Sequence, residues 1–331
     1  MKKFGFRLLI FFGIPLLFFG LLEIFIFEFK EELLSEQNLE SIYKQDAGNY
    51  AWVNNVNADS LKILSGSSSV RYGLSCTILN YLSSNKYNYV NIAMDARDPI
   101  QTYFILKNLD LKNVSAIYFG LDPWIYTKRY YMHRNKYLYL DFSFMQILKF
   151  SKEHDKSAFL KRYKSLIASI LPHNFNVSTN KNQKIPDDYG SIVLDSKAIN
   201  FNDSAYNWFQ IDKYGWSELQ FIYLNKIAKL CNIKKVEFAV FIPPKRSDYS
   251  KDYKENCSLI HNEFLNNLVD ENFNSQIFGK FDQLDSLGDF DNFKEAYHLN
   301  KNGQNKYSKL FYELAKNRKS VFSKDYLWFN N

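Results

Sequence analysis

The sequence predicts an α/β domain built on a mostly parallel five-stranded sheet with helices on both faces, a three-layer α/β/α arrangement. An N-terminal transmembrane helix is expected before it. Strand-like and helix-like segments alternate from residue 61 onward, which is typical of parallel sheets covered on both faces. A single long apolar stretch near the N-terminus is long enough to span the hydrocarbon core of a bilayer.

Five short apolar segments are expected as strands: Leu61–Gly66, Tyr89–Met94, Ser115–Leu121, Val236–Ile242 and Ser275–Phe281. Helices are expected at Ser69–Ser83, Pro99–Leu109 and Trp216–Cys231, and a last amphipathic helix carries Tyr307, Leu310, Phe311 and Leu314. In parallel sheets of this kind the site lies at the C-terminal ends of the strands. Residues that follow the expected strands are therefore the candidates for function.

A long insertion, about Pro123–Tyr214, separates the third and fourth expected strands. It contains a dense aromatic run at Tyr126–Phe144, a basic helix-like piece near Lys152–Leu171 and an Asn/Lys-rich stretch at Asn174–Asp188 that is expected to be a loop. The chain is expected to divide into a membrane anchor (1–29), a stalk (30–60), an α/β domain with this insertion (61–320) and a C-terminal tail (321–331).

The apolar stretch Phe4–Phe27 is expected to be an uncleaved, single-pass anchor. Basic residues precede or enter it and acidic residues follow it, so the N-terminus is expected in the cytoplasm and the rest outside, in a periplasmic or extracellular position. A cleaved signal peptide is the alternative, but large apolar residues continue up to Lys30 without a small-residue cleavage pattern. Glu23, inside the stretch, would have to snorkel, pair or contact a membrane partner.

Charge and cysteine content exclude several classes of function. The net charge is +7, but the lysines are scattered, so no nucleic-acid partner is expected. The chain has no Gly-rich phosphate loop and no zinc-protease motif, so neither a cofactor nor a metal is expected. The three cysteines, Cys76, Cys231 and Cys257, are expected as buried thiols, with a Cys231–Cys257 disulfide as the alternative.

Ser68 is the first candidate catalytic residue. It stands in Gly66-Ser67-Ser68-Ser69, directly after the first expected strand and at the start of a helix. Backbone N–H groups at such a junction stabilise negative charge, which suits a nucleophile whose attack creates an oxyanion. The alternative is that the serines only cap the helix, which is the commoner role at this position.

His298 is the second candidate, in the segment Glu295-Ala296-Tyr297-His298 before the last helix. A carboxylate three residues earlier can hold one imidazole nitrogen and leave the other for a serine. The alternative is a loop histidine that is only structural or merely exposed, which is the commoner case for a histidine taken alone. Asp291 is a fallback acid. The serine comes early in the chain and the acid and histidine come late, and they are expected at the C-terminal end of the first strand and in the last loop of one sheet.

Four segments carry a resemblance to a known family: GSSSVRYGL, NIAMDA, FGLDPW and EAYHLNKNG. They resemble the four blocks of SGNH (GDSL-like) hydrolases, most closely the membrane-anchored bacterial branch. That branch includes proteins of exopolysaccharide O-acetylation and of teichoic-acid D-alanylation. The resemblance spans about Leu61–Gly303 and implies a flavodoxin-like α/β/α fold with a serine acyl-transfer site.

The resemblance implies Ser68 as nucleophile, His298 as base and Glu295 as the acid, where the family has Asp. It implies an oxyanion donor at the backbone N–H of Ala93 or Ala96, where the family often has Gly.

Asp122 stands where the family often has an Asn side chain, and a carboxylate there would repel an oxyanion unless it is protonated or turned away. Arg71, one turn into the helix after Ser68, is expected either to support the catalytic residues or to be an ordinary surface arginine, which is the commoner case.

The implied function is extracytoplasmic acyl transfer, or ester hydrolysis, through a Ser68 acyl-enzyme, with a cell-surface glycan as substrate. The family also implies a partner, a membrane-bound O-acyltransferase that supplies acyl groups. The alternative is an inactive glycan-binding or scaffold subunit. After the fourth strand, Lys245 or Arg246 could attract an anionic substrate or lie in a solvated loop. His133 could line a glycan groove or be merely exposed.

Overall fold

The computed structural model describes residues 2–33, 50–56, 60–84, 88–95, 97–122, 138–153, 156–170, 186, 188–194, 218–241, 243–246, 275–278, 287, 289–295 and 298–317. The chain divides into two compact units. The anchor unit comprises residues 1–48 and 132–179, and the sheet unit comprises residues 49–131 and 180–331. The middle of the insertion therefore belongs with the anchor, although the sequence assigned the whole insertion to the α/β domain.

The sheet unit is of the mixed α/β class with a parallel sheet, as the sequence predicts. Its strands pair in parallel in the order β2-β1-β3-β4-β5. Their bounds are β1 Leu61–Ser65, β2 Asn88–Asn91, β3 Val114–Gly120, β4 Glu237–Phe241 and β5 Ser275–Phe278. In β1 and β3 nearly every residue is buried, as expected of parallel strands with both faces covered.

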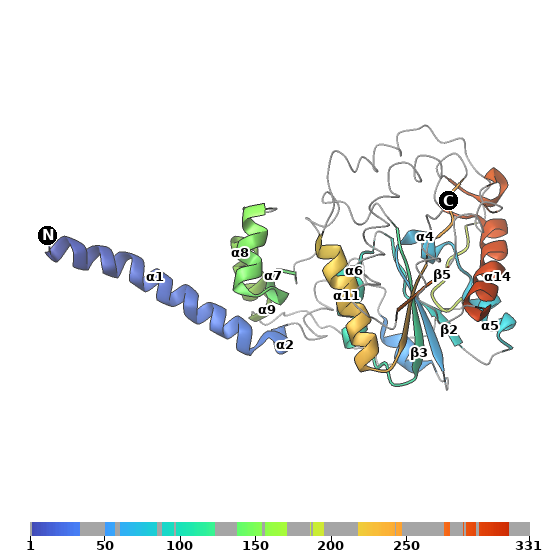
Figure 1. Ribbon diagram of the computed structural model, residues 1–331, viewed down its shortest axis with the longest axis horizontal. Helices are drawn as coiled ribbons and strands as arrows, with labels where there is room; N and C mark the ends of the chain where they lie inside the picture. Colours follow the sequence, from blue (N-terminus) through green and yellow to red (C-terminus); the bar gives the residue numbers. More distant parts are fainter. Residues whose placement is uncertain are drawn as a thin grey trace. The chain divides into compact units, whose positions relative to one another are not determined.

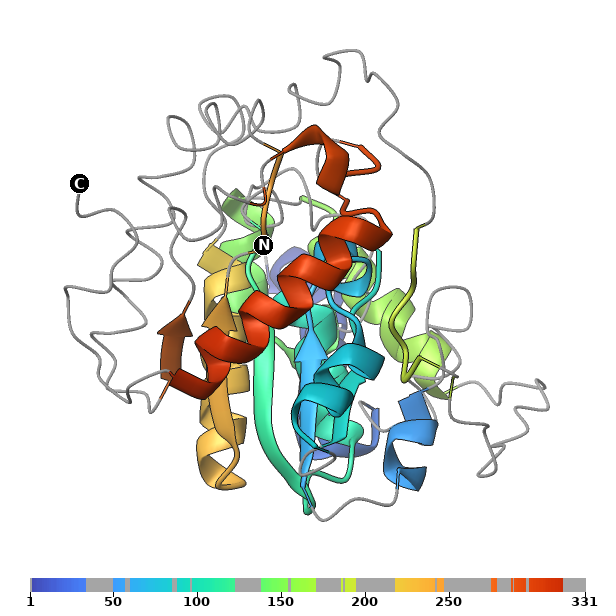
Figure 2. The same cartoon turned by 90° about the vertical axis from the view of Figure 1, so that its right-hand side faces the viewer.

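Helices lie on both sides of this sheet (Figures 1 and 2). On one side are α5 (Cys76–Leu82) and α14 (Lys301–Asn317), and on the other are α6 (Pro99–Asn108) and α11 (Glu218–Ile233). The helix α14 buries Tyr307, Phe311 and Ala315, which share one face at a spacing of four residues. Phe311 packs against Tyr118 of β3 and Phe241 of β4, which fixes α14 across the middle of the sheet.

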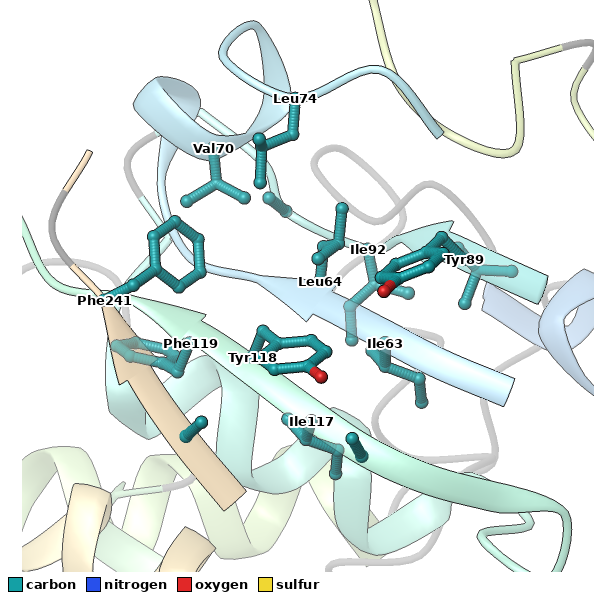
Figure 3. Close-up of a cluster of buried hydrophobic side chains, with 14 of the residues drawn as sticks. Ile63, Leu64, Val70, Leu74, Tyr89, Ile92, Ile117, Tyr118, Phe119 and Phe241 are labelled. Atoms are coloured by element: carbon teal, nitrogen blue, oxygen red, sulfur yellow. The ribbon is translucent and has the colours of Figure 1, made fainter. Parts of the chain in front are cut away.

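The expected helix Ser69–Ser83 is wrong, because two short helices, α4 (Ser68–Arg71) and α5, replace it. Between these two helices the backbone hydrogen-bonds to a residue far away in the sequence. The Ser75 N–H donates to Ser308 Oγ (2.9 Å), and the Ser75 hydroxyl caps α5 by accepting from Ile78 N (3.4 Å). Figure 3 shows Val70 and Leu74 reaching from this segment onto the side chains of the sheet. Packing and capping therefore override the helical pattern of the sequence.

Part of the expected stalk joins the core of the sheet unit. The 3-10 helix η1 (Tyr50–Asn55) buries Trp52 and Val53. A second 3-10 turn, η5 (Phe290–Asn292), precedes the loop that carries His298.

The anchor unit contains the helices α1 (Lys2–Glu28), α2 (Lys30–Leu33), α7 (Leu138–Asp141), α8 (Phe144–Glu153) and α9 (Ala158–Ile170). Within α1, residues Ile10–Glu28 are long and apolar enough to cross a membrane. The helix α9 falls on the expected basic piece. The expected loop at Asn174–Asp188 lies almost wholly outside the described residues.

Candidate active site

Ser68 follows β1 through a tight turn at Gly66. The φ angle of Gly66 is +139°, and a Cβ there would lie 2.8 Å from Val70 Cγ2 and 2.9 Å from Gly120 O, so only glycine fits. Ser68 is the first residue of α4 and is 8% exposed. The strand order reverses between β1 and β3, and α/β sheets bind ligands at this reversal. Ser68 therefore lies where the fold favours a site.

The helix cap at this junction is Ser67 rather than Ser68. Ser67 Oγ accepts a hydrogen bond from Ser69 N (3.3 Å), and its hydroxyl donates to Asp122. Both Ser67 and Ser69 are nearly inaccessible to solvent. The capping role expected for this serine cluster is thus filled by a neighbour of Ser68.

A buried ion pair is bonded to both sequence neighbours of Ser68 and joins the ends of three strands. Lys245 Nζ lies 2.7 Å from Asp122 Oδ1 and donates to Ser69 Oγ at 2.8 Å. Asp122 follows β3 and Lys245 follows β4, and their side chains are 0% and 1% exposed. Together with Ser67, these groups form a closed polar network on both sides of the nucleophile candidate.

The pKa of Asp122 lies below its ordinary value. Burial alone raises this pKa, but the Lys245 ammonium and hydrogen bonds from Lys245 and Ser67 outweigh it. The carboxylate is therefore ionised and its charge is matched by a cation. The expected repulsion between this carboxylate and an oxyanion did not take Lys245 into account, whose ammonium pairs with Asp122.

His298 is paired with Glu295. Its Nδ1 contacts Glu295 Oε1, and the two side chains are 13% and 19% exposed. The hydrogen bond to His298 lowers the pKa of Glu295, although partial burial opposes the shift. A histidine held in this way by Nδ1 acts as a base through its other ring nitrogen, Nε2. The alternative acid, Asp291, is exposed, and its backbone carbonyl accepts from Asn300 Nδ2 (2.8 Å).

The loop that carries this pair is held by its own backbone. Phe293 and Leu299 form an antiparallel bridge, and Lys294 N donates to His298 O at 2.9 Å. The helix α14 then starts close against this loop, because a Cβ at Gly303 would lie 2.0 Å from Asn292 O. The sequence Asn300-Lys301-Asn302-Gly303 thus fixes where His298 stands.

Two buried polar side chains join α14 to the segment after Ser68. Gln304 Nε2 donates to Tyr72 O (3.1 Å) and to Ile192 O (2.9 Å), while Ser308 Oγ accepts from Ser75 N (2.9 Å). These bonds bring the start of α14, and with it the His298 loop, against the α4–α5 connection.

Tyr72 connects the segment that carries Ser68 with the loop that carries His298. Its ring meets the His298 ring edge-on, with centroids 4.9 Å apart and an interplanar angle of 71°. Tyr72 N donates to Ser68 O (2.9 Å), so Tyr72 lies one helical turn after Ser68. Within the described residues no hydrogen bond joins Ser68 to His298. Such bonds are often long without substrate and tighten in the complex.

Arg71 and Ala93 are both engaged within the chain. Arg71 forms an ion pair with Asp95 (3.5 Å), which also accepts from the Tyr72 hydroxyl (3.1 Å). The Ala93 N–H donates to Asn91 Oδ1 (2.9 Å), so this amide is occupied. Ala96, the other expected oxyanion donor, lies outside the described residues, as do His133 and Cys257.

As whole residues, Lys245 and Arg246 are each 4% exposed, so the expected alternative of a solvated loop is wrong. Lys245 instead pairs with Asp122. The sequence did not identify Lys245 as the partner of Asp122, nor Tyr72 and Gln304 as parts of the site. The pairing of Lys245 with Asp122 did leave a signal in the sequence. Each residue follows one of two neighbouring strands, so the two must meet at one edge of the sheet.

Compared with known proteins, the chain matches no protein-family model and no curated protein. The case for its function therefore depends on the geometry of the site.

Proposed function

We propose that this chain is an extracytoplasmic serine acyltransferase or esterase of the SGNH type, with Ser68 as nucleophile, His298 as base and Glu295 as the acid that orients it. The observation that carries the proposal is the contact of the Glu295–His298 pair with Tyr72, one turn after Ser68. A three-layer, flavodoxin-like architecture belongs to the same proposal.

In the first half-reaction, Ser68 Oγ attacks the carbonyl carbon of an acyl donor while His298 Nε2 takes the hydroxyl proton. The tetrahedral intermediate then expels the donor's alcohol, which receives that proton from His298. Glu295 keeps Nδ1 protonated and stabilises the imidazolium. In the second half-reaction, a sugar hydroxyl or water attacks the acyl-Ser68 ester and its proton passes through the same histidine.

The amide of Ser68 itself is the proposed oxyanion donor. It stands at the first position of α4, where backbone N–H groups have no acceptor within the helix. Lys245 assists by compensating the charge of Asp122, which accepts a hydrogen bond from the preceding residue, Ser67. Ala93 has no part in this proposal, because its N–H already donates to Asn91.

The helix α1 is proposed to cross the cytoplasmic membrane once, with its basic N-terminal end inside and the sheet unit outside. No acyl coenzyme A is free outside the cell. The acyl donor is therefore proposed to come from a membrane-bound O-acyltransferase, and a cell-surface glycan hydroxyl is the proposed acceptor.

Fluorophosphonate labelling of the full chain in membranes tests this proposal. The probe phosphonylates an activated serine with loss of fluoride. We expect labelling of the wild type, none of Ser68→Ala, and strongly reduced labelling of His298→Ala. Ser67→Ala and Ser69→Ala serve as matched controls, because each removes a neighbouring hydroxyl and leaves the proposed nucleophile. Both are expected to keep labelling.

A folded wild-type chain that takes no label, or a Ser68→Ala variant that still does, would overturn the catalytic proposal. The first outcome would favour the alternative function, a subunit that binds glycan or organises a membrane complex without turnover.

A further inference from the structure

One face of α1 and α2 is covered inside the anchor unit, while most of the other described side chains of α1 are exposed. Ile26 and Leu33 are 2% and 5% exposed, and Glu23 and Lys30 lie on the same face at helical spacing. Both charges on this face have partners in the insertion. Glu23 pairs with Arg162 of α9, and Lys30 pairs with Asp141 of α7 at 3.0 Å.

Arg162 is the centre of this contact. Its guanidinium binds both carboxylate oxygens of Glu23, at 2.8 and 2.6 Å, and donates to the backbone carbonyls of Tyr139 and Phe142. The Arg162 side chain is 2% exposed. A bidentate, buried pair of this kind is a strong link between two helices and supplies the partner that Glu23 needs inside an apolar stretch.

This link fixes the depth of α9 relative to the apolar stretch. Glu23 lies five residues before the end of the span at Glu28, about 7 Å along the helix. The Tyr163 ring lies against Phe19, with centroids 5.3 Å apart, and Phe19 is about 13 Å from the same end. The outer leaflet contributes about 15 Å of hydrocarbon, so Tyr163 reaches well below the membrane surface.

The helices α8 and α9 also expose large apolar side chains. Met145 is 68% exposed and Ile167 56% exposed, with similar exposure at Phe144, Leu148, Leu160 and Ile170. The helix periodicity is amphipathic in both cases, and Lys149, Lys152 and Lys164 are exposed among these residues. A water-facing position would leave this apolar surface without cover.

We infer that α8 and α9 form an interfacial helix pair, inserted into the outer leaflet of the membrane that α1 crosses. Its apolar side chains contact acyl chains and its lysines meet anionic headgroups. The inference rests on the membrane span in the proposed function and not on the proposed chemistry. Since β3 and β4 flank this segment in the sequence, the sheet unit is tethered to the membrane by the insertion as well as by α1.

Depth-dependent fluorescence quenching tests whether α8 and α9 insert into the membrane. The vesicles consist of phosphatidylglycerol and phosphatidylcholine and contain the full chain as the only protein. A fluorophore is placed on a cysteine at Met145→Cys or Ile167→Cys, with Cys257 changed to Ser. Burial raises the pKa of Cys76 and of Cys231 to about 12, so these thiols stay unlabelled at neutral pH. Ile233→Cys, on α11 and 76% exposed, is the matched apolar control.

We expect nitroxide lipids to quench the labels at 145 and 167 several-fold more than the label at 233. Quenching of 145 and 167 by aqueous iodide, or no lipid quenching beyond the control, would overturn the inference. Labels shielded from both quenchers would also overturn it and would indicate a protein partner on this face. A Leu16→Cys label in α1 tests the span separately, because loss of lipid quenching there would show that the span itself is wrong.

Discussion

The His298 ring packs edge-on against the Tyr72 ring, with centroids 4.9 Å apart. Tyr72 is bonded through its backbone N–H to the carbonyl of Ser68, and its own carbonyl accepts from Gln304 of α14. One residue therefore links the strand-end serine to the loop of the Glu–His pair, although about 230 residues separate the two along the chain. The aromatic contact is expected to set the position of the base.

Replacing Tyr72 by Ala removes this ring contact and is expected to lower kcat up to about tenfold, the rate equivalent of a lost aromatic pair. Tyr72→Phe keeps the ring and loses only the hydrogen bond to Asp95. Its kcat should stay near that of the wild type. Steady-state hydrolysis of a short-chain nitrophenyl ester measures both. Equal losses in the two variants would count against a positioning role for the ring.

Replacing Glu295 by Gln removes the charge that stabilises the imidazolium and is expected to lower kcat by about 100-fold or more. Asp291→Asn is the matched control, because Asp291 is an exposed carboxylate in η5, just before this loop, and Glu295 is the carboxylate in contact with His298. The control should hydrolyse the same ester at the wild-type rate. If Asp291→Asn is the more damaged variant, the acid has been assigned to the wrong residue.

The lowered pKa of Glu295 predicts a stability effect at acid pH. A carboxyl whose folded pKa is depressed contributes stability above its ordinary value of 4.5, and this contribution is lost as the pH falls through the folded pKa. The difference in Tm between the wild type and Glu295→Gln should therefore shrink as the pH falls below about 4.5. Thermal melts across this range check it, and a difference that grows on acidification would refute it.

The Asp122–Lys245 pair is expected to behave as one unit. Asp122→Asn or Lys245→Met alone leaves a buried charge without its partner and should destabilise the fold by about 3–5 kcal/mol. The double variant Asp122→Asn/Lys245→Met should cost much less than the sum of the two single changes. Denaturant unfolding of the four proteins gives the coupling energy. Additive losses would show that the two charges do not stabilise each other.

Much of the sheet unit is predictable because its strands are short apolar runs bounded by turn residues. The span Val236–Ile242 was expected as a strand, and β4 occupies Glu237–Phe241 within it. The break between α4 and α5 was not predictable from local pattern. It depends on Ser308, which lies 233 residues away from Ser75.

The sequence showed which buried charged residues need a partner, but it did not show which residue the partner is. The sequence identified Glu23 as a charge that needs a partner in the apolar stretch, but Arg162 is 139 residues away in the insertion. Likewise Asp122 was expected to disturb the oxyanion, because the neutralising Lys245 becomes visible only when β3 and β4 are side by side. Long-range pairing of this kind leaves no local periodicity.

The central claim is that Ser68 forms an acyl-enzyme with help from His298, and peptide mass mapping after brief exposure to nitrophenyl acetate tests it most directly. We expect one acetyl group on the peptide that contains Ser68, located on that serine by fragmentation. The acetyl group should be absent from the His298→Ala variant. An unmodified Ser68 peptide, or acetylation that is equal in wild type and His298→Ala, would contradict the account.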